Sequence, residues 1–392
     1  SRMTDVAVTA PPRAETDWVA LLHHRAQEHP GRRALTFLPN GRTEDGVLDY
    51  QGLDEAARRV AAVLQSRQGA GERALLLFEP GLDFLKAFIG CLYAGVIAVP
   101  AYPPIHQRFV PRLQGIQQSA QSKFVMTNAA HLDTLGTMLS DCPDLTVLDW
   151  ITPDTIAPGI ERAWRMPDIA GNTLAFLQYT SGSTSAPKGV MVSHENLLRN
   201  EWMMAEAFGT KENTTIVQWV PLYHDMGLIG HVLHALYLGG HCVMMPPLAF
   251  MQRPVRWLQA IANYGADWSA APNFAYELCV EKVRPSQREG LDLSRWKVAG
   301  NGAEPIRRDT VERFGDMFAE NGLRKESLYP CFGLAEATLY VAGNHWRGED
   351  TYRWVVSGEL EQHRVVFCDA HVEGARALVS SGRPALDCVV RI

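Results

Sequence analysis

The chain has 392 residues, of which 46% are hydrophobic and 20% charged, and its formal net charge is −6. This composition is typical of a globular protein, and the absence of a long basic run argues against a surface that tracks nucleic acid phosphates. The longest uncharged apolar stretch, residues 87–104, is too short and too rich in proline for a membrane-spanning helix.

Strands and helices alternate along the first part of the chain. Apolar residues at helical spacing predict helices over 18–29, 50–65, 81–94, 109–119 and 130–140. Short apolar runs predict strands over 34–38, 73–78, 96–99, 123–127 and 145–148. A proline-rich segment, 152–169, reads as a connector. This alternation predicts an open α/β sheet that is largely parallel.

The second part of the chain continues the same alternation. Strands are predicted over 173–178, 190–192, 214–220, 241–245, 268–271, 297–299 and 327–330. Helices are predicted over 194–208, 228–238, 253–264, 274–283 and 306–321. Four unusual loops each follow one of these strands. Because ligands of open α/β sheets bind beyond the carboxyl ends of the strands, we expect the four loops to converge on one crevice.

The first of these loops, residues 179–189, is rich in hydroxyl groups. It contains Thr180, Ser181, Gly182, Ser183, Thr184, Ser185 and Lys188. Backbone N–H groups, hydroxyls and one mobile cation suit a polyphosphate. The loop is not a Walker A sequence, because Pro187 precedes the lysine and Gly189 follows it. A plain surface connector is the alternative, although the apolar runs on both sides weigh against it.

The second loop places His224 beside Asp225, directly after a predicted strand. A histidine there suits a polar site, where it orients a carboxylate or stabilises developing charge. Taken alone, a hydrogen-bonded structural histidine is the more common meaning of this pattern.

The third and fourth loops carry glycines and acids. In the third, Gly302 allows a flat ligand to approach the backbone, and Glu304 suits the first turn of a helix. In the fourth, Phe332 offers a stacking face, and Glu336 offers a carboxylate for Mg²⁺ or simply begins a helix. Cys331 precedes this loop as a candidate nucleophile, but a small buried thiol is the favoured interpretation.

The seven cysteines are scattered, and none forms a C-x-x-C pair. This spacing argues against a disulfide scaffold or a zinc site. It favours a reducing, cytoplasmic location.

In this order and spacing, the four loops resemble those of the adenylate-forming (ANL) superfamily. The segments 218–230, 272–276, 301–305 and 332–338 are most similar to the fatty acyl-AMP ligase branch. Two residues depart from the wider superfamily pattern. Ser185 stands where the phosphate loop usually has glycine, and Ala335 stands where many relatives have threonine.

The resemblance implies an α/β fold with two mainly parallel sheets and flanking helices in an αβαβα arrangement, followed by the start of a smaller β-barrel subdomain. It divides a large N-terminal adenylation domain, 1–392, into subdomains at about 15–200 and 201–344. Residues 345–392 are then an insertion and the start of the β subdomain. The chain ends inside a strand pattern, and relatives carry a further mobile domain, so we expect it to be a fragment with impaired activity.

The resemblance also implies a reaction: a fatty acid and ATP give an acyl-adenylate and pyrophosphate, and the acyl group passes to the phosphopantetheine of an acyl carrier protein. Lys188 and residues 180–184 would hold phosphates, and Glu336 would bind Mg²⁺. His224 would lie between the acyl tunnel and the α-phosphate. Asn301, Gly302, Ala303, Phe332 and Gly333 would border the nucleotide. Trp219, Met226, Ile229, Asn273, Phe274 and Tyr276 are candidates for the acyl tunnel, with ordinary core packing as the alternative.

Two other functions stay open at this point. One is an acyl- or aryl-CoA ligase of the same superfamily. The other is a non-catalytic module that uses the fold to bind a nucleotide.

Overall fold

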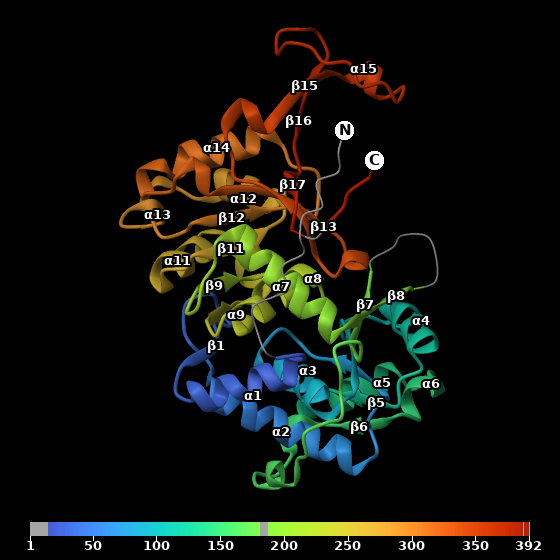
Figure 1. Ribbon diagram of the computed structural model, residues 1–392. Coiled ribbons are helices and arrows are strands. Elements are labelled where there is room, and N and C mark those ends of the chain that lie inside the picture. The colour runs from blue at the N-terminus through green and yellow to red at the C-terminus, as the bar shows by residue number, and fades with distance from the viewer. Residues whose placement is uncertain (1–14, 181–186, 387, 392) are drawn as a thin grey trace, which may run out of the picture.

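Two stacked sheets and three layers of helices make up the molecule, as the computed structural model in Figure 1 shows. The structure describes residues 15–180, 187–386 and 388–391. Within these ranges, no helix is both long enough and apolar enough to cross a membrane.

The first sheet, in the lower half of Figure 1, has six strands in the order β6-β5-β3-β4-β7-β8. Its strands are β3 (Arg73–Leu77), β4 (Ile97–Ala101), β5 (Phe124–Met126), β6 (Asp149–Ile151), β7 (Leu174–Tyr179) and β8 (Gly189–Ser193). Its pairs are parallel except for β7 with β8, whose antiparallel register joins Tyr179 to Gly189. The predicted phosphate loop is therefore the connection of a hairpin.

The second sheet has nine strands in the order β17-β14-β13-β12-β11-β9-β10-β1-β2. Its strands are β1 (Arg33–Phe37), β2 (Val47–Asp49), β9 (Thr215–Gln218), β10 (His241–Met244), β11 (Trp268–Ala271), β12 (Val298–Asn301), β13 (Leu328–Gly333), β14 (Tyr340–Gly343) and β17 (Arg383–Pro384). The central pairs are parallel, and antiparallel strands lie at both edges. No closed barrel forms among the described strands.

Helices cover both outer faces and fill the space between the sheets. The inner layer holds α1 (Trp18–Glu28), α2 (Tyr50–Ser66), α3 (Leu82–Ala94), α7 (His194–Phe208), α8 (Asp225–Gly227), a π-helix (Leu228–Leu233) and α9 (His234–Tyr237). The face of the first sheet away from it carries α4 (Val110–Ala120), α5 (Leu132–Met138) and α6 (Pro143–Thr146). The far face of the second sheet carries α10 (Pro247–Gln252), α11 (Val255–Tyr264), α12 (Asn273–Lys282) and α14 (Arg308–Phe318), with α13 (Pro285–Arg288) nearby. This order confirms the αβαβα arrangement.

Side-chain alternation explains the layers. In β11, Trp268 and Ala270 belong to the core between the sheets, whereas Ala271 belongs to the outer core. Successive residues of a strand point to opposite faces, so both faces of this sheet are buried and its strands are apolar at nearly every position.

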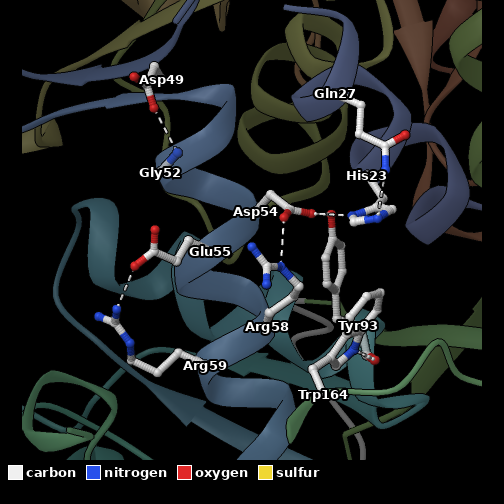
Figure 2. Close-up of polar contacts among 10 residues, drawn as sticks. All are labelled: His23, Gln27, Asp49, Gly52, Asp54, Glu55, Arg58, Arg59, Tyr93 and Trp164. Carbon is white, nitrogen blue, oxygen red and sulfur yellow. Dashed lines mark hydrogen bonds and ion pairs between the residues drawn. The ribbon is translucent and has the colours of Figure 1, made fainter. Parts of the chain in front are cut away.

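A buried carboxylate ties three segments of the inner layer together (Figure 2). Asp54, on α2, accepts hydrogen bonds from Tyr93 Oη and Arg58 Nε at 2.8 and 2.7 Å, and lies 2.8 Å from His23 Nδ1. Trp164 Nε1 donates to the Tyr93 carbonyl oxygen at 2.8 Å, which attaches the connector to α3. These contacts hold α1, α2 and α3 as one block.

A two-stranded extension projects from the end of the second sheet at the top of Figure 1. It consists of β15 (Tyr352–Val356) and β16 (Ala375–Val379), with α15 (Ser357–Leu360) between them. The guanidinium of Arg308, on α14, lies 5.0 Å from the ring of Tyr352 and 5.6 Å from that of Trp354. Residues 345–392, predicted as an insertion and the start of the β subdomain, thus contain a β-hairpin whose base rests on α14.

Candidate active site

The carboxyl ends of β9, β12 and β13 carry three of the four predicted loops to one edge of the second sheet. A pocket of ≈ 500 Å³, counting its open mouth, lies there. Its described lining is Met204, Phe208, Asp225, Met226, Gly230, Trp268, Ala270, Gly302, Ala303, Cys331, Phe332, Gly333, Leu339 and Tyr340. The second, third and fourth loops therefore meet in one pocket.

The pocket is lined mainly by apolar side chains and glycines, and it has an open mouth and a buried interior. Ala303 and Phe332 are exposed at the mouth, where Phe332 keeps 48% of its surface accessible. Deeper in, α7 supplies Phe208 and β11 supplies Trp268, and both are buried. A flat ring can lie against Phe332 at the mouth, and an apolar chain suits the buried interior.

Two glycines allow the pocket wall to form. A Cβ at Gly333 would lie 2.1 Å from the carbonyl oxygen of Leu339, and a Cβ at Gly302 would lie 2.8 Å from that of Cys331. Neither approach is possible for a larger residue. The neighbouring Ala303 has a φ of +66°, a left-handed conformation that non-glycine residues adopt rarely and mostly where function requires it.

His224 and Asp225 lie at the start of α8, beside the pocket. Asp225 lines the pocket, and its Oδ1 accepts a hydrogen bond from Met226 N at 2.7 Å. His224 is half exposed, with its Nδ1 3.5 Å from Asp225 Oδ1. An imidazole in this position is free to face a ligand that reaches the mouth.

His231, which sequence reasoning did not single out, ties two walls of the pocket together. Its Nδ1–H donates to the carbonyl oxygen of Met226 at 2.7 Å, and its Nε2 accepts from Ala270 N at 2.9 Å. Burial lowers the pKa of His231 to about 4, so the ring is neutral at pH 7, as these two bonds require. The only signal in the sequence is a histidine inside an apolar helix, which does not distinguish this role from core packing.

The N-terminal end of the phosphate loop is held by α4. Tyr179 Oη donates to Ser119 Oγ at 2.8 Å, and Arg112 Nη2 donates to the carbonyl oxygen of Thr180 at 3.2 Å. Lys188 is exposed. The predicted phosphate ligands Ser181, Gly182, Ser183 and Thr184, together with Ser185, lie outside the described residues.

The predicted acyl-tunnel residues do not all gather at the pocket. Met226 lines it, and Ile229 is buried in the inner core. Trp219 and Tyr276 pack in the outer core, on the opposite face of the sheet, where the ring of Trp219 stacks on Phe250.

Asn273 and Phe274 begin α12, on that same outer side. Asn273 Oδ1 accepts hydrogen bonds from Asn301 Nδ2 at 3.3 Å and from Arg307 N at 3.1 Å, so the Asn301 side chain is directed away from the pocket. Phe274 is exposed, and its backbone N–H donates to Glu304 Oε1 at 2.6 Å. These residues support the third loop from behind.

Glu336 and Cys331 flank the fourth loop. Glu336 is exposed on a short 3₁₀ helix, Ala335–Ala337, directly after β13. Across the described ranges, no three His, Cys, Asp or Glu side chains gather as a metal site. A single carboxylate still fits Mg²⁺, which commonly takes one or two carboxylates together with substrate phosphates. Burial raises the pKa of the Cys331 thiol to about 12, which argues against a thiolate nucleophile.

Comparison with known protein families gives a match over most of the chain. The family described as AMP-binding enzyme matches residues 22–371. The chain belongs to this family.

Relatives of this AMP-binding enzyme include fatty acid ligases. It is 42% identical to the medium-chain-fatty-acid–[acyl-carrier-protein] ligase JamA of Moorena producens over 93% of this chain and 63% of JamA. It is 32% identical to the corresponding ligase TtuA of Teredinibacter turnerae over 91% of this chain and 61% of TtuA. The chain thus spans less than two thirds of either relative.

A solved structure of a fatty acyl-adenylate ligase is also similar to this AMP-binding enzyme. The fatty acyl-adenylate ligase of Legionella pneumophila, in complex with acyl adenylate and pyrophosphate, superposes with a TM-score of 0.86 at 41% identity. The match covers 95% of this chain and 64% of that one. The predicted resemblance to fatty acyl-AMP ligases is confirmed.

Proposed function

We propose that the protein containing this chain joins a fatty acid to AMP, releasing pyrophosphate from ATP, and passes the acyl group to an acyl carrier protein. The observation that carries the proposal is the pocket, because its apolar interior opens at the carboxyl edge of the sheet, where three of the predicted loops meet. Its sequence relatives JamA and TtuA are acyl-carrier-protein ligases for medium-chain fatty acids, which supports the same assignment.

In this proposal the carboxylate of the fatty acid attacks the α-phosphorus of ATP, and the bond to the bridging oxygen of pyrophosphate breaks. Bringing two anions together requires cations and preorganised donors. Lys188 and the hydroxyls of residues 180–184 would hold the β- and γ-phosphates. His224, half exposed and next to the lining residue Asp225, would face the carboxylate and the α-phosphate.

The nucleotide and its metal would occupy the outer part of the site. Phe332, Gly302 and Ala303 would border the adenine, while Gly333 would shape the turn beside it. Glu336 would hold Mg²⁺, which supplies positive charge to the phosphates when bound. The acyl chain would enter the pocket alongside Met226, because Trp219 and Tyr276 lie on the far face of the sheet.

The test measures fatty-acid-dependent exchange of pyrophosphate into ATP by the full-length protein, with mass spectrometry of the acyl-adenylate. Lys188→Ala should lower the exchange rate by about 10²- to 10³-fold, the usual loss for one charge-stabilising group. Because Lys188 is exposed, the variant should fold normally. Lys282→Ala, an exposed lysine on the outer helix α12, is the control and should retain full activity.

A second arm separates the two thioester-forming alternatives. The adenylate is offered either a phosphopantetheinylated carrier protein or free coenzyme A. Transfer to the carrier protein alone supports the proposal, and rapid formation of acyl-CoA would assign the chain to the CoA ligases instead. If the full-length protein forms no adenylate from any acid, a non-catalytic nucleotide-binding role is left.

A further inference from the structure

One side chain, Phe208, lies between the pocket and a second cavity. The second cavity, of ≈ 820 Å³ including open solvent, opens at the opposite edge of the nine-stranded sheet, where β9, β11 and β12 begin. It is lined by the segment from Phe208 to Thr214 and by Asp267, Arg295, Lys297 and Val298. Phe208 is the one residue that lines both spaces in the described part of the chain.

Its surroundings hold the Phe208 ring firmly in this position. The ring stacks on Trp268 with centroids 4.2 Å apart and an interplanar angle of 17°. Tyr340 and Tyr329 meet it edge-on at 5.1 and 5.3 Å, and their hydroxyls are 2.8 Å apart. Phe208 is also the last residue of α7, which ends at Gly209 in the left-handed conformation. The ring is therefore a fixed partition.

The two sides of this partition differ in chemistry. On the pocket side, Phe208 adjoins Met204, Trp268 and Tyr340. On the other side, the cavity presents charged groups that include Lys297, whose Nζ pairs with Asp267 at 3.0 Å. An apolar chain gains free energy from burial on the first side but would meet charge and water on the second.

We propose that Phe208 is the floor of the acyl pocket and sets the longest fatty acid that the enzyme activates. This inference rests on the proposed function. β11, which runs between the two edges, has four residues and so spans about 13 Å. A chain that enters at the mouth ends at the Phe208–Trp268 stack after less than that length, which suits acids of medium rather than long chain.

The experiment compares acids of increasing length, from octanoic through dodecanoic to hexadecanoic acid, in the full-length protein. The kcat/KM for acid-dependent ATP–pyrophosphate exchange is measured for the wild type, Phe208→Leu and Phe208→Ala. Phe208→Ala should raise the ratio of hexadecanoic to octanoic acid by about tenfold or more, since methylene groups previously excluded can now be accommodated. Phe208→Leu should raise it by a smaller factor and keeps the core filled if the alanine variant does not fold.

Phe250 provides a matched control. It is fully buried, and its ring stacks on Trp219 with centroids 4.0 Å apart, but it belongs to the outer core and lines neither space. Phe250→Leu and Phe250→Ala should lower the melting temperature without changing the chain-length profile. A wild-type profile in folded Phe208→Leu would overturn the inference. A wild type that activates no acid of any length would instead overturn the proposed function.

Discussion

At the scale of single residues, a buried histidine outside the pocket lining holds two walls of the pocket together. His231 bridges the Met226 carbonyl and the Ala270 amide, and only its neutral form both donates and accepts. Its position inside a π-helix is consistent with this role, because π-helical turns are frequent at functional sites. Protonation would remove the acceptor and break the hydrogen bond from Ala270 N.

This contact predicts a pH dependence of stability. The unfolded chain binds a proton at His231 below about pH 6.5, whereas the folded chain does so only near pH 4. Stability from this residue is therefore present above pH 6.5 and is lost as the pH falls toward 4. His231→Gln should reduce the slope of unfolding free energy against pH in this window by about 1.4 kcal/mol per pH unit.

Urea denaturation at a series of pH values measures this slope. Burial also lowers the pKa of His194, His234 and His241, so several histidines contribute to the slope of the wild type. The difference between the slopes of the wild type and His231→Gln gives the contribution of His231 alone. Above pH 7 the two curves should run parallel, which provides an internal control. Identical slopes between pH 4 and 6.5 would show that His231 is already protonated in the folded protein.

At the scale of elements, α2 carries carboxylates on two adjacent residues, and we expect them to contribute very differently to stability. Asp54 is 5% exposed and binds three partners, whereas Glu55 forms one ion pair, with Arg59, near the surface. Asp54→Ala should lower the unfolding free energy by about 3–5 kcal/mol, because it leaves buried partners unpaired.

The matched control is Glu55→Ala, which should cost less than about 1 kcal/mol, as exposed pairs do. Denaturant titration of both variants measures the difference. Equal losses of unfolding free energy in the two variants would mean that the Asp54 contacts drawn in Figure 2 stabilise the fold no more than an exposed ion pair does.

Most elements could be predicted from the sequence, and the exceptions have physical reasons. The predicted strand over 145–148 is wrong, because Pro143 begins the short helix α6 and the strand starts at Asp149. An apolar run of four residues does not distinguish a short helix from a strand. The three residues of β2 are likewise too few to give a period.

For a related reason, the sequence could not predict which residues of the second sheet border the pocket. Trp219 directly follows β9 and Trp268 begins β11, but they belong to opposite cores. Where a sheet is buried on both sides, its strands show no polar alternation that would identify the face bordering the pocket. The loops were easier to find because glycine, histidine and acid side chains interrupt the apolar pattern.

At the scale of the whole molecule, the β15–β16 extension is attached to the second sheet mainly through its base. Trp346 stacks on Tyr352 at 5.9 Å, and Arg308 lies over Tyr352 and Trp354. Arg308→Ala should therefore loosen the extension alone. A cation–π contact is worth about 1 kcal/mol, which corresponds to about fivefold faster hydrogen exchange over 352–356 and 375–379.

Hydrogen exchange with mass spectrometry measures this directly. Arg313→Ala, on the same helix α14, removes a partly exposed ion pair with Glu277 and serves as the control. Exchange in β9, β11 and β12 should be unchanged in both variants. Faster exchange throughout the second sheet of Arg308→Ala would show that the extension folds as part of it.

The position of β1 has a consequence for how this protein is made. Strand β1, which contains the apolar residues Ala34 and Leu35, pairs with β10. During synthesis, β10 leaves the ribosome about two hundred residues after β1. At 5–20 residues per second, the ribosome leaves that edge uncovered for roughly 10–40 s. During this interval an unpaired apolar strand is a template for other chains. Covering β1 until β10 has been synthesised therefore lowers the risk that this chain pairs with another.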